Sequence, residues 1–158
     1  MSIEKIKGAV SPDIARANRF EILGILPLLE VRAKAASVPQ ATIGKCEANY
    51  MGRVIPLAGD IVYPDWTVTV YQDTSGTVRR ALYAWSQEIN AHIANVGSAQ
   101  AKRDGIVIQY GYDGGVVATY QIKQCYPINI GEVTLASDTY DTPSEWTVTF
   151  AIEQWIAG

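Results

Sequence analysis

The chain has 158 residues, of which 48% are hydrophobic and 18% are charged, and its formal net charge is −3. This much apolar material is enough for the core of a single domain spanning 1–158, and it excludes intrinsic disorder. The lysines and arginines form no run, which argues against tight binding of nucleic acid. Residues 1–8 lack a continuous apolar stretch, and Gly24 and Pro27 interrupt the longest apolar run. We therefore expect neither a secretory signal nor a membrane anchor.

The N-terminal third predicts an arm, two strands and an irregular segment. Residues 1–18 are polar without a clear period, so this arm is either a contact with a neighbouring subunit or a frayed tail. Residues 19–25 and 28–35 predict two strands joined at a proline, which cannot donate a ladder hydrogen bond. Residues 42–57 predict either a long, twisted hairpin or an extended loop, and 58–60 (Ala-Gly-Asp) reads as a turn.

Two later segments share one strand pattern. Residues 65–70 (Asp-Trp-Thr-Val-Thr-Val) resemble 145–150 (Glu-Trp-Thr-Val-Thr-Phe), and both alternate apolar and polar residues with a period of two. We expect two half-buried strands, 65–71 and 145–155, that are neighbours in one sheet. Their apolar faces supply predicted core residues: Trp66, Val68 and Val70 in the first strand, and Trp146, Val148 and Phe150 in the second, where Ile152 continues the same face.

Residues 76–96 carry the helical pattern. Their apolar residues recur every three or four positions and form one stripe, which is typical of a helix packed on a core. Ser75 or Thr77 is the expected N-cap, and Gly97 suits the left-handed position after the last turn. The stripe contains Val78, Leu82, Trp85, Ile89, Ile93 and Val96, of which Leu82, Trp85 and Ile89 are the predicted core residues.

The C-terminal half predicts further strands. Residues 105–110 and 116–123 flank 112–115 (Tyr-Asp-Gly-Gly), whose glycines permit the positive φ of a tight hairpin turn. Residues 127–135 predict another strand. Strands on both sides of a single helix indicate a mainly β (α+β) fold, namely an antiparallel sandwich or barrel of two packed sheets flanked by one α-helix.

Residues typical of catalysis or metal binding are sparse. His92 is the only histidine, no Gly-x-Ser-x-Gly motif occurs, and 111–115 lacks the Lys-Ser/Thr of a phosphate-binding loop. Asp60 and Asp65 border a turn and a strand start rather than a cleft. Cys46 and Cys125 have no spacing of a metal site or redox motif, so we expect two buried free thiols. No catalytic residue, cofactor or metal is expected.

An ordered set of segments resembles the tail tube proteins of contractile-tailed bacteriophages. The set begins with residues 19–22 (Arg-Phe-Glu-Ile) and 52–73 (GRVIPLAGDIVYPDWTVTVYQD). It continues with the helix around Trp85, the segment 126–133 (YPINIGEV) and the strand 146–155. The similarity covers nearly the whole chain in order. Two segments depart from it: the turn at 26–28 is short, and 42–50 does not match closely.

The resemblance implies a structural subunit of a virion tail. Members of the family form hexameric rings that stack into a hollow tube. The tube is driven through the host envelope when a sheath contracts, and it conducts DNA. Copies of the chain, the sheath, and baseplate and terminator proteins at the tube ends are then the partners, with assembly in the host cytoplasm. Open sheet edges in a small β protein agree with this, because copies can pair them.

Two regions are the expected interfaces of such a tube. The irregular stretch 42–60 is the candidate contact between rings, and strands within 43–57 and 106–122 are candidates for the wall of the channel. The candidate inter-ring residues are Cys46, Tyr50, Arg53 and Asp60.

Other readings remain open from the sequence alone. A tube subunit of a tailocin or a type VI secretion system has the same pattern. A β-sandwich that binds a small ligand would require a pocket with converging polar groups. An enzyme would require a cluster of titratable groups with perturbed pKa values.

Overall fold

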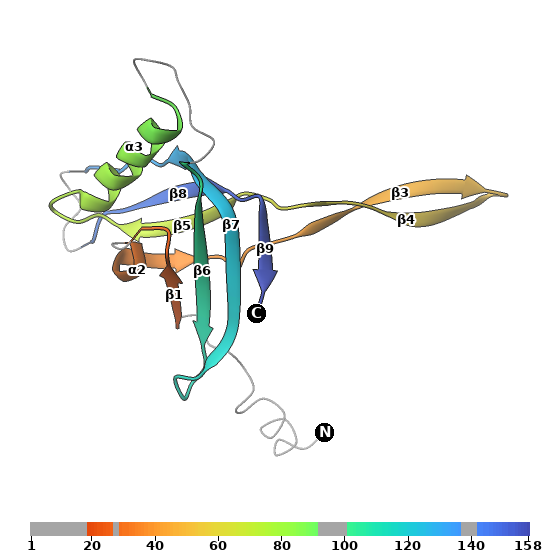
Figure 1. The fold of residues 1–158 in the computed structure, drawn as a ribbon, viewed down its shortest axis with the longest axis horizontal. Helices are drawn as coiled ribbons and strands as arrows, with labels where there is room; N and C mark the ends of the chain where they lie inside the picture. The colour runs from red at the N-terminus through yellow and green to blue at the C-terminus, as the bar shows by residue number, and fades with distance from the viewer. Residues whose placement is uncertain (1–18, 27–28, 92–100, 137–141) are drawn as a thin grey trace.

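The structure is a computed structural model that describes residues 19–26, 29–91, 101–136 and 142–158. The described chain is mostly antiparallel β-sheet with a longer helix and a single helical turn (Figure 1). The arm 1–18 and His92 lie outside the described residues. In chain order the elements are β1 Phe20–Leu23, α2 Leu29–Arg32, β2 Ala33–Ala36, β3 Thr42–Tyr50, β4 Arg53–Val62, β5 Trp66–Tyr71, α3 Thr77–Ile89, β6 Arg103–Tyr110, β7 Val116–Ile130, β8 Glu145–Ala151 and β9 Gln154–Ala157.

Two layers of sheet share the strand β7. Within the described residues the strand order is β1-β6-β7-β8-β5-β2, and β9 also pairs with β7. Tyr120 to Lys123 of β7 pair with β9, whereas its end, from Tyr126 to Ile130, pairs with β8. We call β1, β6, β9 and the start of β7 the first layer, and β2, β5, β8 and the end of β7 the second layer. The mainly β, two-layered class predicted from the sequence is confirmed.

A local irregularity lets β7 pass from one layer to the other. Gln124 has a φ of 54°, which is uncommon for a residue with a side chain, and the register with β6 shifts beside it. Asp104 of β6 holds this bend, because its carboxylate accepts hydrogen bonds from the backbone N–H of Gln124 (2.9 Å) and from Nζ of Lys123 (3.0 Å). Such a bulge redirects a strand, and Figure 1 shows β7 curving along its length.

The two similar strands are neighbours, as predicted. β5 and β8 pair antiparallel, with Trp66 opposite Phe150, Val68 opposite Val148 and Val70 opposite Trp146. The threonines between them face the other side, and the hydroxyl oxygens of Thr67 and Thr149 lie 3.4 Å apart.

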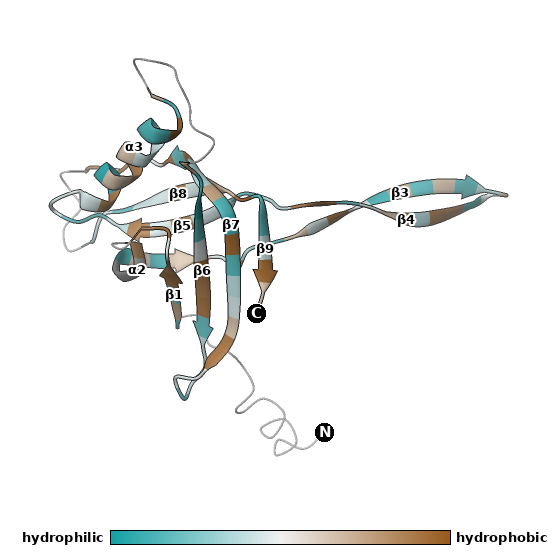
Figure 2. Cartoon of the chain, in the orientation of Figure 1, coloured by the Kyte–Doolittle hydropathy of each residue, from teal (hydrophilic) through white to brown (hydrophobic). Residues whose placement is uncertain are grey.

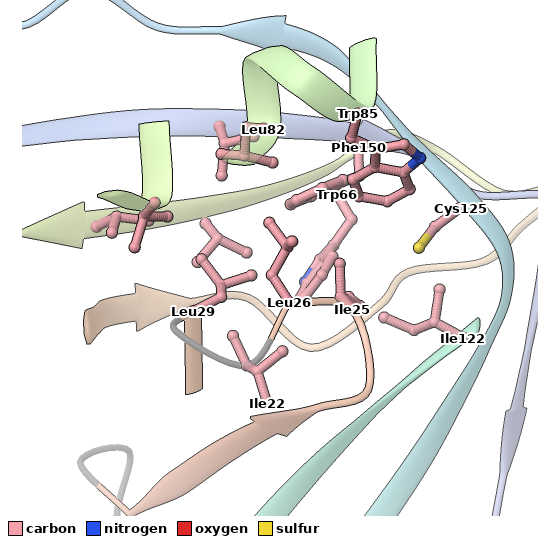
Figure 3. Close-up of a cluster of buried hydrophobic side chains, with 14 of the residues drawn as sticks. Ile22, Ile25, Leu26, Leu29, Trp66, Leu82, Trp85, Ile122, Cys125 and Phe150 are labelled. Atoms are coloured by element: carbon pink, nitrogen blue, oxygen red, sulfur yellow. The ribbon is translucent and has the colours of Figure 1, made fainter. Parts of the chain in front are cut away.

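The core lies between the two layers and α3 (Figure 3). The ring of Phe150 lies 5.6 Å from Trp66 and 6.1 Å from Trp85, centroid to centroid. Ile89 is partly buried at the edge of the core. The other predicted core residues are buried: Trp66, Val68, Val70, Leu82, Trp85, Trp146, Val148 and Phe150.

The start and end of α3 differ from the prediction. Neither Ser75 nor Thr77 is the N-cap; that position is Gly76, with a φ of 61° and no side-chain cap bond. The carboxylate of Asp73 takes the capping role, because it accepts the backbone N–H of Thr77 at 3.2 Å. The helix ends at Ile89, where Asn90 becomes extended, and Gly97 lies outside the described residues.

The predicted strand 28–35 is instead one helical turn followed by a strand. The turn α2 places Leu29 at full burial, and the backbone N–H of Leu29 donates to the carbonyl oxygen of Leu26 at 3.0 Å. Residues three apart on a helical turn share a face. Leu26 and Leu29 therefore both reach the core, which a strand would not allow.

The predicted strand 145–155 is also divided. β8 ends at Ala151, and the chain crosses to the first layer as β9, with Ile152 buried at the crossing. The predicted strand 127–135 is the end of β7 and stops at Ile130. In both cases the chain passes from one layer to the other, and a period of two in the sequence cannot reveal such a crossing.

Replacing Trp66 tests the centre of the core. Trp66→Ala removes a side chain that is 1% exposed, so we expect the free energy of unfolding to fall by about 3–5 kcal/mol. Chemical denaturation followed by tryptophan fluorescence measures this. Thr67→Ala, on the exposed side of the same strand, is the control. Equal stability of the two variants would contradict the placement of Trp66.

Asp73 should make the stability depend on pH. The hydrogen bond that Ser75 donates to the Asp73 carboxylate is the largest cause that holds the pKa of this carboxyl well below its ordinary value. The interaction with Arg32 is the second cause. The ionised carboxylate then stabilises the fold above the ordinary aspartate pKa of about 4, and this contribution is lost as the pH falls toward the lowered pKa. We expect Asp73→Asn to flatten the acid side of a plot of Tm against pH. An acid limb as steep as that of the parent protein would count against this role.

Candidate interaction surface

The hairpin β3–β4 stands away from the rest of the described chain (Figure 1). Its strands pair only with each other and form a separate two-stranded sheet. Every residue of both strands is exposed. Of the two structures that the sequence allowed for 42–57, the long hairpin is therefore the one observed.

The turn of this hairpin lies at its tip. Met51 and Gly52 have φ values of 47° and 76°, and positive φ at both central residues is what a type I′ turn requires. The predicted turn at 58–60 is wrong, because these residues lie inside β4. Gly59 approaches the backbone of Gly44 closely there, since a Cβ on Gly59 would lie 3.1 Å from it. A register shift at this point marks a bulge rather than a reversal of the chain.

The outer part of the hairpin has two chemically different faces. Residues paired across antiparallel strands share a face. One face, which we call the Cys46 face, consists of the pairs Cys46–Leu57, Ala48–Ile55 and Tyr50–Arg53. The other, the Lys45 face, consists of Lys45–Ala58, Glu47–Pro56 and Asn49–Val54.

Charge and hydropathy separate these faces. On the Lys45 face, Nζ of Lys45 lies 2.5 Å from a carboxylate oxygen of Glu47. On the Cys46 face the only charged side chain is Arg53, next to the tip. Figure 2 shows hydrophobic residues along β4 in the open, where Ile55 and Leu57 are about half exposed.

Of the candidate inter-ring residues, the structure brings three onto one face. Cys46, Tyr50 and Arg53 all lie on the Cys46 face, and Asp60 lies nearer the root, beside the bulge. The expectation of two buried thiols is half wrong, because Cys46 is exposed in an open hairpin. Cys125 is buried in the core, and burial raises the pKa of its thiol to about 12.

Two tryptophans hold the root of the hairpin. Nε1 of Trp66 donates to the carbonyl oxygen of Ser37 (2.6 Å), and Nε1 of Trp155 donates to that of Gln40 (3.0 Å). The ring of Trp155 packs edge-on against Tyr120, 5.6 Å away between centroids. Sequence reasoning missed Trp155, since its partner is a backbone carbonyl far away in the chain and leaves no local signal.

The first layer has a second face that no element of the described chain covers. Ile22, Val107 and Ile122 point into the core, so the residues beside them on each strand point away from it. This outward face mixes apolar side chains with polar and charged ones: Glu21, Leu23, Ile106, Ile108, Thr119, Gln121, Lys123 and Ile156.

Unpaired backbone borders the first layer. Among the described strands, β1 pairs only with β6 and β9 only with β7, so each presents a free edge. A free edge has unpaired N–H and C=O groups and is a ready template for another strand. Tyr110 and Glu21 join β6 to β1 through an O–H···O bond of 2.6 Å, and this bond raises the pKa of the Tyr110 hydroxyl.

Features of an enzyme or a ligand-binding module are weak in the part of the chain that the structure describes. No group of three His, Cys, Asp or Glu side chains there is placed to hold a metal ion. No described helix is both long and apolar enough to span a bilayer. An open groove of about 550 Å³ lies at the start of α3, but its arginines bind backbone: Arg79 donates to Gly131 (2.5 Å) and Arg80 to Ser75.

The fold is shared with solved contractile injection assemblies. The chain resembles one in the sheath–tube complex of an extracellular contractile injection system, PVC, in the extended state, with a TM-score of 0.71, 15% identity and coverage of 100% of this chain and 98% of that one. It also resembles one in the tube-terminating cap of the anti-feeding prophage, with a TM-score of 0.70, 17% identity and coverage of 100% and 99%. These similarities show that the chain has the same fold as those two chains.

Relatives in sequence identify the family of the chain more specifically than the shared fold does. The chain is 34% identical to tail tube protein gp19 of Enterobacteria phage T4, over 92% of this chain and 93% of that protein. It is 20% identical to the tail tube protein of Serratia phage KSP90, over 92% and 91%. No family model matches the chain. The chain belongs to the phage tail tube protein family, and it is a structural component of the virion tail.

Trp155 offers a test of how the hairpin is held. Trp155→Phe keeps an aromatic ring against Tyr120 but removes the donor to Gln40, so we expect faster amide hydrogen exchange at the root of β3. Ile156→Ala, one position along β9 on the opposite face, is the control. Hydrogen exchange with mass spectrometry would measure both variants. Equal exchange at residues 40–43 would show that this hydrogen bond does not hold the hairpin.

Proposed function

We propose that copies of this chain form hexameric rings that stack into the hollow tube of a contractile phage tail. The tube is driven through the host envelope when the sheath contracts, and its channel conducts DNA. The chain has no catalytic role and requires no cofactor. Membership of the tail tube protein family supports this proposal, as do the similar solved chains from a sheath–tube complex and a tube-terminating cap.

The exposed hairpin is the observation that carries the proposal. An isolated two-stranded hairpin is marginally stable in water, and a monomer rarely exposes large contiguous apolar surface. β3–β4 is such a two-stranded hairpin, with 19 residues in its two strands, nine in β3 and ten in β4, and it exposes apolar side chains along both strands. Contact with neighbouring copies would cover it, so we assign the hairpin to contacts between rings, through Cys46, Tyr50, Arg53 and Asp60.

The first layer is our candidate for the channel wall. It consists of four strands with free edges at β1 and β9, so that the β1 edge of one copy can pair with the β9 edge of the next. Repeating this head-to-tail contact closes a ring. The outward face of β6 and β7, within the predicted segment 106–122, then lines the channel. Segment 43–57, which we also predicted as a part of the channel wall, lies in the hairpin β3–β4 and not in the first layer.

The charge of the chain suits passage of DNA. A polyanion binds surfaces rich in lysine and arginine, and a net charge of −3 without a basic run offers it no strong site. On the outward face of the first layer, Lys123 is paired with Asp104 at 3.0 Å. The wall would therefore let DNA slide rather than hold it.

The partners follow from the assemblies that share the fold. We propose contact with a tail sheath along the outside of the tube, and with terminator and baseplate proteins at its ends. A tailocin or a type VI secretion system would use the same kind of subunit. A solved type six secretion system protein shares the fold with a TM-score of 0.53 and 12% identity. A sheath gene beside a terminase gene would mark a phage tail.

Electron microscopy tests the proposal directly. We expect the purified chain to form hollow rods or six-fold rings in negative stain, and light scattering to rise with protein concentration. A chain that stays monomeric at high concentration would refute self-assembly. A single closed barrel with a filled polar cavity would instead favour a ligand-binding module.

A further inference from the structure

We propose that the hairpin docks by one face only, so that the Cys46 face lies against a second copy of this chain and the Lys45 face stays in water. This inference rests on the proposed function and specifies the side chains of that contact. The two faces belong to the same strands and are similarly exposed in the single chain. Their chemistry is what distinguishes them.

The Cys46 face has the composition of an interface core. Cys46, Ala48, Ile55 and Leu57 form an apolar patch, and Tyr50 extends it to the tip with 64% of its surface exposed. Interfaces are enriched in tyrosine and arginine and depleted in lysine and glutamate. The single charge on this face, Arg53, lies at its end, where it can remain at the rim of a contact.

Docking through the Lys45 face would cost free energy. Lys45 and Glu47 already form an ion pair in water, and burying both charges without new partners costs more than their attraction returns. Asn49 adds an amide that would also need a partner. Val54 lies on this face as well, but the ion pair and the amide interrupt its apolar surroundings.

Two features keep the faces from exchanging. A slip of one residue in the pairing would move every side chain of one strand to the opposite face. The turn at Met51 and Gly52 fixes the register at the tip, since both residues have the positive φ that the turn requires. The close approach of Gly44 and Gly59 fixes it at the bulge. The sidedness is therefore built into the backbone.

A second copy is the occupant that the chain itself supplies. In a polymer of one subunit, the protein nearest to each hairpin is another copy. The body of the chain also offers matching chemistry away from the proposed channel wall, because Tyr83 on α3 and Leu135 after β7 are each exposed by more than half of their surface. An apolar face with one terminal charge fits such a surface better than it fits a nucleic acid.

Two neighbouring residues of β4 give a matched test. Ile55 and Val54 are both β-branched, lie on opposite faces and are 47% and 57% exposed, so an aspartate at either position leaves the single chain folded. We expect Ile55→Asp to raise the critical concentration for assembly about tenfold or more, because docking would bury an unpaired carboxylate. Val54→Asp should leave it within about twofold of the parent value, because surface charges contribute little.

Sedimentation of the polymer and circular dichroism of the dilute chain provide the two readouts. Equal loss of assembly in both variants, or a larger loss in Val54→Asp, would overturn the sidedness. Assembly unaffected by either substitution would overturn docking by the hairpin altogether. Failure of the unmodified chain to form rods or rings would instead refute the proposed function.

The two thiols provide an independent readout without any substitution. Cys125 is buried, so Cys46 is the thiol that a maleimide reaches in the folded single chain. We expect one labelled cysteine per chain in the dilute protein or in the Ile55→Asp variant, and none in assembled tubes. Tubes whose Cys46 reacts as fast as it does in the dilute chain would overturn the proposal while leaving self-assembly intact.

Discussion

A two-stranded ribbon that stands in water has two unpaired backbone edges and no layer of its own chain to cover its apolar side chains. Both strands of β3–β4 are exposed throughout, and the described body provides no surface on which they lie. This constraint governs the rest of the structure. None of the described residues covers the hairpin, and the rest of the described fold holds its root in one orientation.

The body is built to keep that orientation fixed. Trp66 is both a central core residue and a donor to the carbonyl oxygen of Ser37, just before the hairpin, and β4 runs into β5 within a few residues. Trp155 makes the corresponding bond to Gln40 from β9. The same strand β9 presents a free edge of the first layer. The root of the hairpin and the edge available to a ring neighbour are therefore joined through a single side chain.

Sharing β7 between the two layers has a consequence for assembly. The bend at Gln124, held by Asp104, lets the start of the strand extend the first layer while its end completes the second. The second layer and α3 enclose the core, and the first layer keeps one face uncovered. A chain of this size thus has both a packed interior and a sheet surface left over for an assembly with other copies.

Local pattern in the sequence was enough to predict the two-layered β class, the pairing of β5 with β8, and the burial of Leu82 and Trp85 on one face of a helix. Each depends on spacing within a few residues, and that spacing sets which side of a strand or helix a residue occupies. The resemblance to tail tube proteins rested on the order of such segments along the chain. Tertiary structure alone decided the helical turn at Leu29, the tip of the hairpin at Met51, the division of the last strand at Ile152 and the bond from Trp155 to Gln40. In most of these cases the deciding contact joins residues or layers that are distant in sequence. At the hairpin tip, the pairing of the apolar side chains decides which of two permitted turns forms. Local periodicity contains neither kind of information.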